Sequence, residues 1–249
     1  MAYCLDVVIQ SHSNCYFLWD DEPSYRPYSR FSRLTPSDPP DLPTRATRDR
    51  GKQLFDIFGL GSLNAVNAKF RDLVERFEPG VHLFHPITLH EKDGTQIADD
   101  YFIFLARQAA DFVLTIESDL KWSDYGTHGP PAPNWFSTSF ETHHPDHKKS
   151  KAARERKHGI LASAKARGHM VDYPKHMQAS SQAISGLHLW TGQTIFQKQL
   201  FASDELFRAF EKSKLKYLQS NFYCFEQDVP WDATEQLKPI MDWRRQHLQ

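Results

Sequence analysis

The sequence predicts an α+β protein with mixed, largely antiparallel sheets flanked by helices, in two lobes that are each built on a helix-strand unit. Short runs rich in β-branched and aromatic residues recur between turn residues, which is typical of strands. Two other stretches carry apolar residues at helical spacing behind a capping residue, and each is followed by a further strand.

The chain opens with two apolar runs, "YCLDVVIQ" and "CYFLWDD", which predict two short strands joined by a polar turn. The first run is interrupted by Asp6 and has no basic flank, so it resembles neither a signal peptide nor a membrane span. We therefore expect a cytoplasmic protein without a membrane partner. Prolines are dense in residues 23–43, and because each removes a backbone donor, this stretch is predicted to be an irregular loop.

The first helix-strand unit is "NAVNAKFRDLVERFEPGVHLFHPITL". Asn64 or Asn67 can cap its helix, and Pro79-Gly80 ends it. The preceding "FGLGSLN" lacks the third glycine of a dinucleotide-binding turn and is interpreted as a turn that leads into the helix at Asn64. A strand, an Asp-Gly turn in "EKDGTQ" and further strand residues in "DYFIFLARQAADFVLTI" follow. One helix face is apolar, with Val66, Phe70, Leu73, Val74 and Phe77.

The second unit begins with "GLHLWTGQTIFQKQLFA", which predicts two strands about Gly192. Ser203 then caps a helix whose first turn carries Asp204 and Glu205, where carboxylates suit the positive end of the helix dipole. The Ser-Asp-Glu triplet is therefore interpreted as structural. The helix turns Leu206, Phe207 and Phe210 inward, and "NFYCFEQ" supplies the next strand.

A His-rich and basic insert, about residues 125–178, separates the two units and includes a predicted basic helix, 148–157. The C-terminal stretch predicts a short helix, with Trp231 and Trp243 as docking anchors. Charge is unevenly distributed, because residues 1–142 hold 20 acidic and 13 basic side chains whereas residues 143–178 hold 3 and 9. An acidic body with a basic insert indicates a polarised surface.

Two stretches raise alternative functions. His143, His144 and His147, with Glu141 and Asp146, are of the types that bind divalent ions, which would suit a metal-dependent hydrolase. They match no established ligand spacing, and Pro145 interrupts any helix that would align them. The basic helix 148–157 could contact nucleic acid, but it lacks stacking aromatic residues, which favours a solvated face.

The sequence predicts no cofactor and no catalytic set. Cys4, Cys15 and Cys224 are an odd number without metal-like spacing, so we expect reduced thiols that pack as small apolar side chains.

Read together, the two units resemble immunity-protein family 11 of bacterial polymorphic toxin systems. The resemblance covers residues 50–122 and 184–227 and rests on a helix, a strand with Phe84, His85 and Pro86, an aromatic strand, and a later Ser-Asp-Glu helix start followed by a final strand. Residues 125–178 and the C-terminal extension depart from the family pattern. The resemblance implies a single immunity-type domain, residues 1–249, without catalytic residues to carry over.

Membership in such a family implies inhibition by binding: the protein would hold a cognate toxin domain inactive until that toxin is exported. Such an interface needs complementary shape and charge and, commonly, aromatic anchors. The segment of negative excess is the hypothesis for the contact. Its residues are Asp99, Asp100, Glu117, Asp119, Asp124 and Glu141, with Trp122 and Trp135 as anchors.

Overall fold

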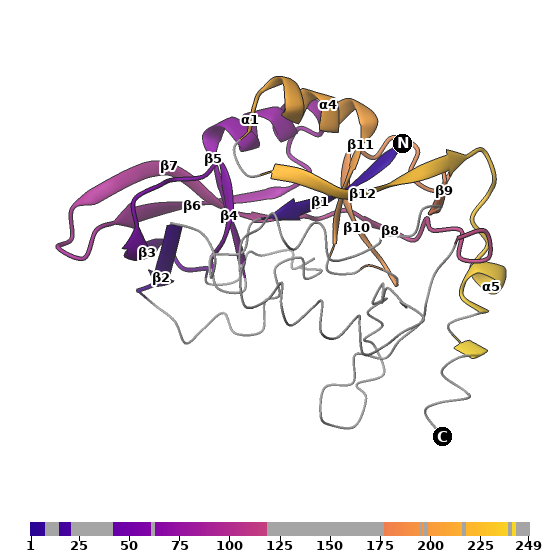
Figure 1. Ribbon diagram of the computed structural model, residues 1–249, viewed down its shortest axis with the longest axis horizontal. Helices are drawn as coiled ribbons and strands as arrows, with labels where there is room; N and C mark the ends of the chain where they lie inside the picture. Colours follow the sequence, from indigo (N-terminus) through magenta and orange to yellow (C-terminus); the bar gives the residue numbers. More distant parts are fainter. Residues whose placement is uncertain are drawn as a thin grey trace, which may run out of the picture.

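The computed structural model describes residues 1–7, 15–20, 42–60, 63–118, 177–194, 196, 199–215, 218–238 and 241–242 of the 249. Within these ranges the chain forms two six-stranded sheets and three helices (Figure 1). The predicted α+β class and the two helix-strand units are confirmed. Residues 23–41 of the proline-rich stretch, residues 125–176 of the basic insert, and Trp243 lie outside the described residues.

The first sheet has the strand order β2-β3-β6-β7-β5-β4. Neighbours in it are antiparallel except β3 and β6, which run parallel. The predicted Asp-Gly turn connects β6 to β7, and Gly94 there has a φ of +87°, a conformation that glycine adopts without strain. The strands are β2 (Cys15–Trp19), β3 (Arg45–Gly51), β4 (Ile57–Leu60), β5 (Leu63–Asn67), β6 (Leu83–His90) and β7 (Gln96–Leu105).

The second sheet has the order β8-β10-β11-β1-β12-β9, with β8 parallel to β10 and β9 parallel to β12. Its central strand, β1, comes from the N-terminus, so the first two strands of the chain belong to different sheets. The strands are β1 (Ala2–Val7), β8 (Ala109–Ala110), β9 (Gln178–Ser180), β10 (Leu189–Gly192), β11 (Leu200–Ser203) and β12 (Leu218–Gln227).

The two main helices begin at capping residues. α1 (Ala68–Phe77) is capped by Asn67, whose side chain accepts a hydrogen bond from the Phe70 N–H at 3.1 Å. α4 (Asp204–Lys212) is capped by Ser203, whose hydroxyl accepts from the Leu206 N–H at 3.2 Å. Each side chain supplies an acceptor for an N–H that the helix itself leaves unpaired. The predicted cap at Ser203 is confirmed, and of the two candidate asparagines Asn67 is the cap.

Two details of the first unit were predicted wrongly. Asn64 and Val66 lie in β5, not at the start of the helix, and the described residues of "FGLGSLN", 58–60 and 63–64, belong to strands β4 and β5. These residues pair with β4 on one side and β7 on the other, and such pairing holds a buried segment extended. The predicted inward residues Phe70, Leu73 and Val74 are buried, as expected.

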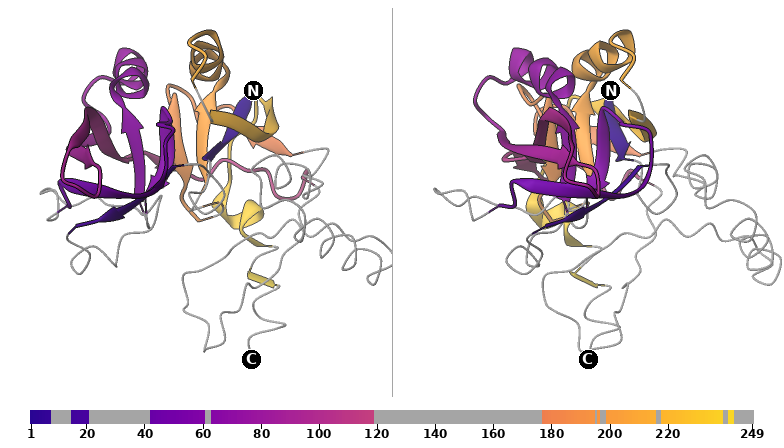
Figure 2. Two further views of the ribbon diagram at one scale, coloured as in Figure 1. Left: turned by 60° about the vertical axis from the view of Figure 1, so that its left-hand side comes forward. Right: turned by 90° about the vertical axis from the view of Figure 1, so that its left-hand side faces the viewer.

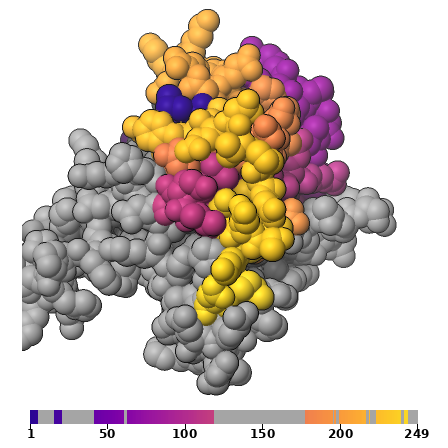
Figure 3. Space-filling model, turned by 90° about the vertical axis from the view of Figure 1, so that its right-hand side faces the viewer, coloured from indigo at the N-terminus to yellow at the C-terminus, as the bar shows by residue number. Residues whose placement is uncertain are grey.

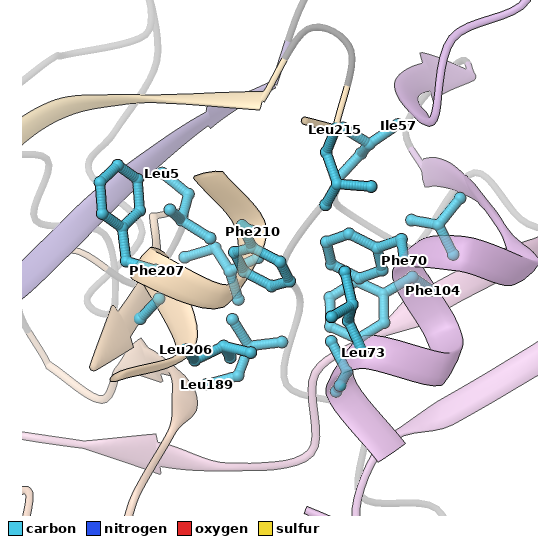
Figure 4. Packing of buried hydrophobic residues seen from close by; sticks show 14 of the residues in the cluster. Leu5, Ile57, Phe70, Leu73, Phe104, Leu189, Leu206, Phe207, Phe210 and Leu215 are labelled. Atoms are coloured by element: carbon cyan, nitrogen blue, oxygen red, sulfur yellow. The ribbon is translucent and has the colours of Figure 1, made fainter. Parts of the chain in front are cut away.

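α1 and α4 lie side by side on one face of the two sheets, α1 over the first and α4 over the second (Figures 1 and 2). Phe70 of α1 stacks on Phe210 of α4, with ring centroids 5.3 Å apart and planes 13° from parallel. Leu73 and Leu206 enter the same cluster, together with Phe104 of the first sheet (Figure 4). One hydrophobic core thus joins both units.

The opposite faces of the sheets each have a separate apolar cluster. Phe17, Phe58 and Ile103 belong to that of the first sheet, and Trp190 and Phe201 to that of the second. Phe112 meets Trp190 and Phe201 in edge-on contacts with centroids 5.6 and 4.8 Å apart. Because side chains alternate across a strand, each sheet has both faces occupied by apolar residues.

The C-terminal stretch packs against the second sheet through α5 (Ala233–Gln236). Trp231 docks as predicted, since its indole nitrogen donates to the Val113 carbonyl at 3.1 Å. Gln236 is 3% exposed, and its side-chain oxygen accepts from the Thr115 N–H at 2.5 Å. This contact pairs polar groups that burial would otherwise leave unsatisfied.

The two sheets repeat one arrangement of strands. An antiparallel hairpin (β4–β5 or β10–β11) leads into a helix (α1 or α4) and then into a strand (β6 or β12). In each sheet another strand (β7 or β1) lies between the last hairpin strand and the strand after the helix, antiparallel to both. A further strand (β3 or β9) runs parallel on the outside.

The register of the two sheets also agrees. The cap residue Asn67 pairs with Tyr101, whose other neighbour is Ile87; the cap residue Ser203 pairs with Ala2, whose other neighbour is Cys224. The backbone N–H of each cap donates at 2.9 Å to the carbonyl of the residue just before the hairpin, Asp56 or His188. The helix-strand unit is therefore a structural repeat, and the two copies can be compared position by position.

Candidate interaction surfaces

Asp99 and Asp100 lie on β7 where its pairing with β6 shifts by one residue. Ile87 pairs with Tyr101 and Leu89 with Ala98, so both aspartates lie opposite Thr88. Such a bulge leaves an extra residue outside the ladder, and both carboxylates are exposed. Nearby charges at this end of the sheet are already paired: Lys92 with Asp49 at 3.1 Å and Arg48 with Glu91 at 3.0 Å.

The other predicted contact residues do not gather at this bulge among the described parts of the chain. Glu117 is exposed, but it follows the segment that pairs with β9, in the second sheet. β7 and this segment lie at opposite ends of the molecule (Figure 1). The remaining predicted residues lie outside the described residues: Asp119, Trp122, Asp124, Trp135 and Glu141.

A buried carboxylate, Glu78, joins the two sheets. It follows the last residue of α1 and is 4% exposed. Its oxygens accept hydrogen bonds from the backbone N–H groups of His188 at 2.6 Å and Leu189 at 3.1 Å, where β10 begins. They also lie 2.6 Å from Nε2 of His82. A carboxylate with several donors compensates for the loss of water around a buried charge.

The hydrogen bonds show which nitrogen of the His82 ring carries its hydrogen. Nδ1 of His82 accepts from the Arg107 N–H at 3.3 Å, so the ring carries its hydrogen on Nε2 and donates it to Glu78. Burial raises the pKa of Glu78, but the donors at His82, His188 and Leu189 outweigh burial and hold that pKa below its ordinary value.

A glutamate beside a histidine can act in acid–base chemistry, but the hydrogen bonds of this pair hold segments of the fold together. Both side chains are buried, and every hydrogen bond described above ties one segment of the fold to another. We therefore assign Glu78 and His82 a structural role. In the sequence, Glu78 stands in "RFEPG" and resembles an ordinary solvated helix end, because nothing local shows that β10 will reach it.

A group of aromatic side chains lies where α4 meets the second sheet, with exposed rings on β12 and a buried ring, Phe207, on α4. We call it the aromatic ledge and define it as Tyr3, Phe207, Tyr223 and Phe225. Tyr3 stacks on Phe207 with centroids 4.1 Å apart, and Tyr223 meets Phe225 at 5.2 Å. Tyr223 is 47% exposed and Phe225 39%. β12 lies at the surface here, below α4 and beside the N-terminus (Figure 3).

The other candidate sites concern the cysteines, metal-binding side chains and membrane-spanning helices. Cys4 and Cys224 are buried free thiols, as predicted, and burial raises the pKa of Cys224, which keeps it protonated at neutral pH. The described ranges contain no group of three or more metal-binding side chains, and no described helix is long and apolar enough to cross a membrane. His143, His144, His147 and the predicted basic helix 148–157 lie outside the described residues.

Sequence comparison identifies the relatives of this chain. The model of the Imm11 immunity protein family matches residues 12–141, which is more than half of the chain. The chain belongs to this family. None of the curated proteins matches it.

The Imm11 match covers the whole first sheet, α1 and β8. It confirms the predicted family, although the part of the resemblance at 184–227 lies beyond the matched residues. Asp99, Asp100 and the other predicted contact residues fall inside the match, whereas the aromatic ledge falls outside it. A signal for the ledge was present in "NFYCFEQ", where alternate positions are aromatic, but the sequence did not show which face of that strand would stay open.

Proposed function

We propose that this chain is the immunity member of a toxin–immunity pair: it binds a cognate toxin domain in the cytoplasm of the producing cell and inhibits it stoichiometrically, without turnover. Membership in the Imm11 family is the observation that carries this proposal. We further propose that residues 1–249 act as one domain, which is supported by the core that α1 and α4 share.

The experiment pairs the chain with the C-terminal domain of the polypeptide encoded directly upstream. Cells that express this domain alone should stop growing, and co-expression of the chain should restore growth. In titration with purified proteins, toxin activity should fall in proportion to added chain and vanish at a fixed, near-equimolar ratio. Inactivation of many toxin molecules by one chain would contradict inhibition by binding, and failure to restore growth would contradict the function itself.

The predicted acidic surface is part of this proposal. Its described members are Asp99, Asp100 and Glu117, and the two aspartates, which adjoin on β7, are the pair to test. Exposed carboxylates at a bulge are free to steer a positively charged partner and to pair with it on contact. Replacing both by lysine should slow association about tenfold or more at low salt, as followed by stopped-flow fluorescence. Asp72→Lys/Glu235→Lys is the control with the same change in net charge, because both residues are exposed and lie on other elements, α1 and α5. Equal association rates for both variants would exclude this surface.

A further inference from the structure

The aromatic ledge differs from the corresponding place in the first sheet. By the shared register, Phe102 corresponds to Tyr3, Pro86 to Tyr223 and Thr88 to Phe225. Counted from the helix caps, Arg71 corresponds to Phe207, and its guanidinium lies 4.4 Å from the centre of the Phe102 ring. The first sheet thus has a proline and a threonine where the second exposes Tyr223 and Phe225, and a cation where α4 carries the buried Phe207.

This difference shows that the fold itself does not require the exposed rings. The same strand pairing forms with Pro86 and Thr88 as with Tyr223 and Phe225. Leaving large apolar side chains half in water forgoes the stabilisation that burial would supply. Adjoining exposed aromatic side chains are a feature of protein contact sites, where tyrosine is enriched among the residues that dominate binding.

Charges of both signs lie around the ledge: carboxylates, and two cations, which are Arg208 and the N-terminal ammonium, 3.0 Å from Glu226. Asp204 accepts a hydrogen bond from the Tyr3 hydroxyl at 3.1 Å and pairs with Arg208 at 2.6 Å. Glu211, one turn further along α4, is exposed. Burial raises the pKa of Tyr3, and the carboxylates of Asp204 and Glu211 raise it further, whereas Arg208 acts in the opposite direction. The opposite end of the ledge is neutral, with Gln227 donating to Gln178 at 3.0 Å.

We propose that the aromatic ledge is a contact surface for the toxin and that it receives a segment with lysine or arginine side chains. Cationic side chains bind over the faces of exposed aromatic rings, and the carboxylates at the edge complement their charge. This inference rests on the proposed function, since it names a surface and a chemistry for the same partner.

The first experiment measures binding of the upstream-encoded C-terminal domain by calorimetry. Tyr223→Ala/Phe225→Ala should weaken binding about 100-fold, a loss typical of central aromatic anchors. Leu18→Ala is the matched control, because Leu18 is 49% exposed on β2 of the other sheet, and its binding should stay within twofold of the unmodified chain. Glu211→Lys should weaken binding and reduce its dependence on salt.

These outcomes distinguish a failure of the ledge proposal from a failure of the proposed function. If the unmodified chain does not bind or neutralise that domain, the function fails. If it does, and both the double variant and Glu211→Lys bind like the Leu18→Ala control, the ledge proposal is overturned while the function stands.

A second experiment does not depend on the stability of the double variant. A photoreactive phenylalanine at position 225 should crosslink to a Lys/Arg-containing toxin peptide, as identified by mass spectrometry. The same group at position 18, the exposed control position on β2 of the first sheet, should give little product. Equal crosslinking from both positions, an acidic peptide, or crosslinks only to a second copy of this chain would each overturn the proposal.

Discussion

The two sheets reach the same strand arrangement with differently ordered chain segments. In the first, the strand between β5 and β6 is β7, which follows directly as a hairpin partner of β6. In the second, the equivalent strand is β1, which comes from the far N-terminus. β12 also contains one residue more than β6 at this point, and the register shift between Cys4 and Leu5 absorbs it. The two sheets therefore share strand pairing and register, although the equivalent strands occur in a different order along the chain.

The comparison also shows how two similar units become one molecule. Each helix covers its own sheet on one side and meets the other helix on its flank, where Phe70 and Phe210 stack. The carboxylate of Glu78 makes a polar connection beside this apolar one. Each helix is buried partly against its own sheet and partly against the other helix, so we expect the two units to unfold together in one transition.

The largest effect should come from breaking the contact between the helices. Phe210→Ala should lower the free energy of unfolding by about 3–5 kcal/mol, because it removes a buried ring and leaves a cavity beside Phe70. Urea unfolding followed by circular dichroism measures this, and the unmodified chain should give one transition. Arg208→Ala is the surface control on the same helix. Two separate transitions in the unmodified chain would show that the units are independent.

Removing the polar connection should have the next largest effect. Glu78→Ala should cost about 3 kcal/mol, because the buried N–H groups of His188 and Leu189 and the ring of His82 lose their acceptor. Hydrogen exchange locates the damage: amides at the start of β10 should lose protection more than those of β4. Asp72→Ala, at an exposed position of α1, is the control. Equal protection in β10 with and without Glu78 would refute the connection.

The lowered pKa of Glu78 predicts a pH dependence. A carboxyl group whose pKa is lower in the folded state stabilises the fold above its unfolded value, for which 4.5 is the reference, and that stabilisation is lost as pH falls through the folded value. The unmodified chain should therefore lose unfolding free energy more steeply below pH 4.5 than Glu78→Gln does. Unfolding curves from pH 7 to pH 3 measure this, and parallel curves would contradict it.

The sequence predicted what short stretches determine and missed what distant segments decide. The cap at Ser203 and the inward residues of α4 depend on neighbours within a few positions, so the pattern sufficed. The position of β1 between β11 and β12 joins residues about 200 positions apart, as Ala2 with Ser203, and no local pattern encodes that pairing. The role of Glu78 was hidden for the same reason, since its partners start a strand that lies 110 residues further along.

The same contrast between local patterns and distant contacts applies to the candidate surfaces. The acidic excess was visible in the composition, and Asp99 and Asp100 are exposed, but no local pattern indicated the bulge that places both opposite Thr88. The aromatic residues of β12 were identified as strand residues. Which of them remain exposed depends on tertiary contacts such as that of Tyr223 with Tyr3, a residue 220 positions earlier in the chain.

The smallest effects test whether the repeat extends to the helix caps. Asn67→Ala and Ser203→Ala should each cost about 1 kcal/mol, because each side chain accepts the hydrogen bond of an otherwise unpaired helix N–H. The two should be similar, since each cap also reaches the residue before its hairpin: Asn67 donates to Asp56 at 2.7 Å, and the Ser203 hydroxyl lies 3.0 Å from His188 Nδ1. Ser203→Asp keeps the acceptor and should retain most of the stability, as thermal unfolding can show. A loss with Ser203→Asp as large as with Ser203→Ala would mean that the cap itself contributes little and that the tie to His188 is what stabilises the start of α4.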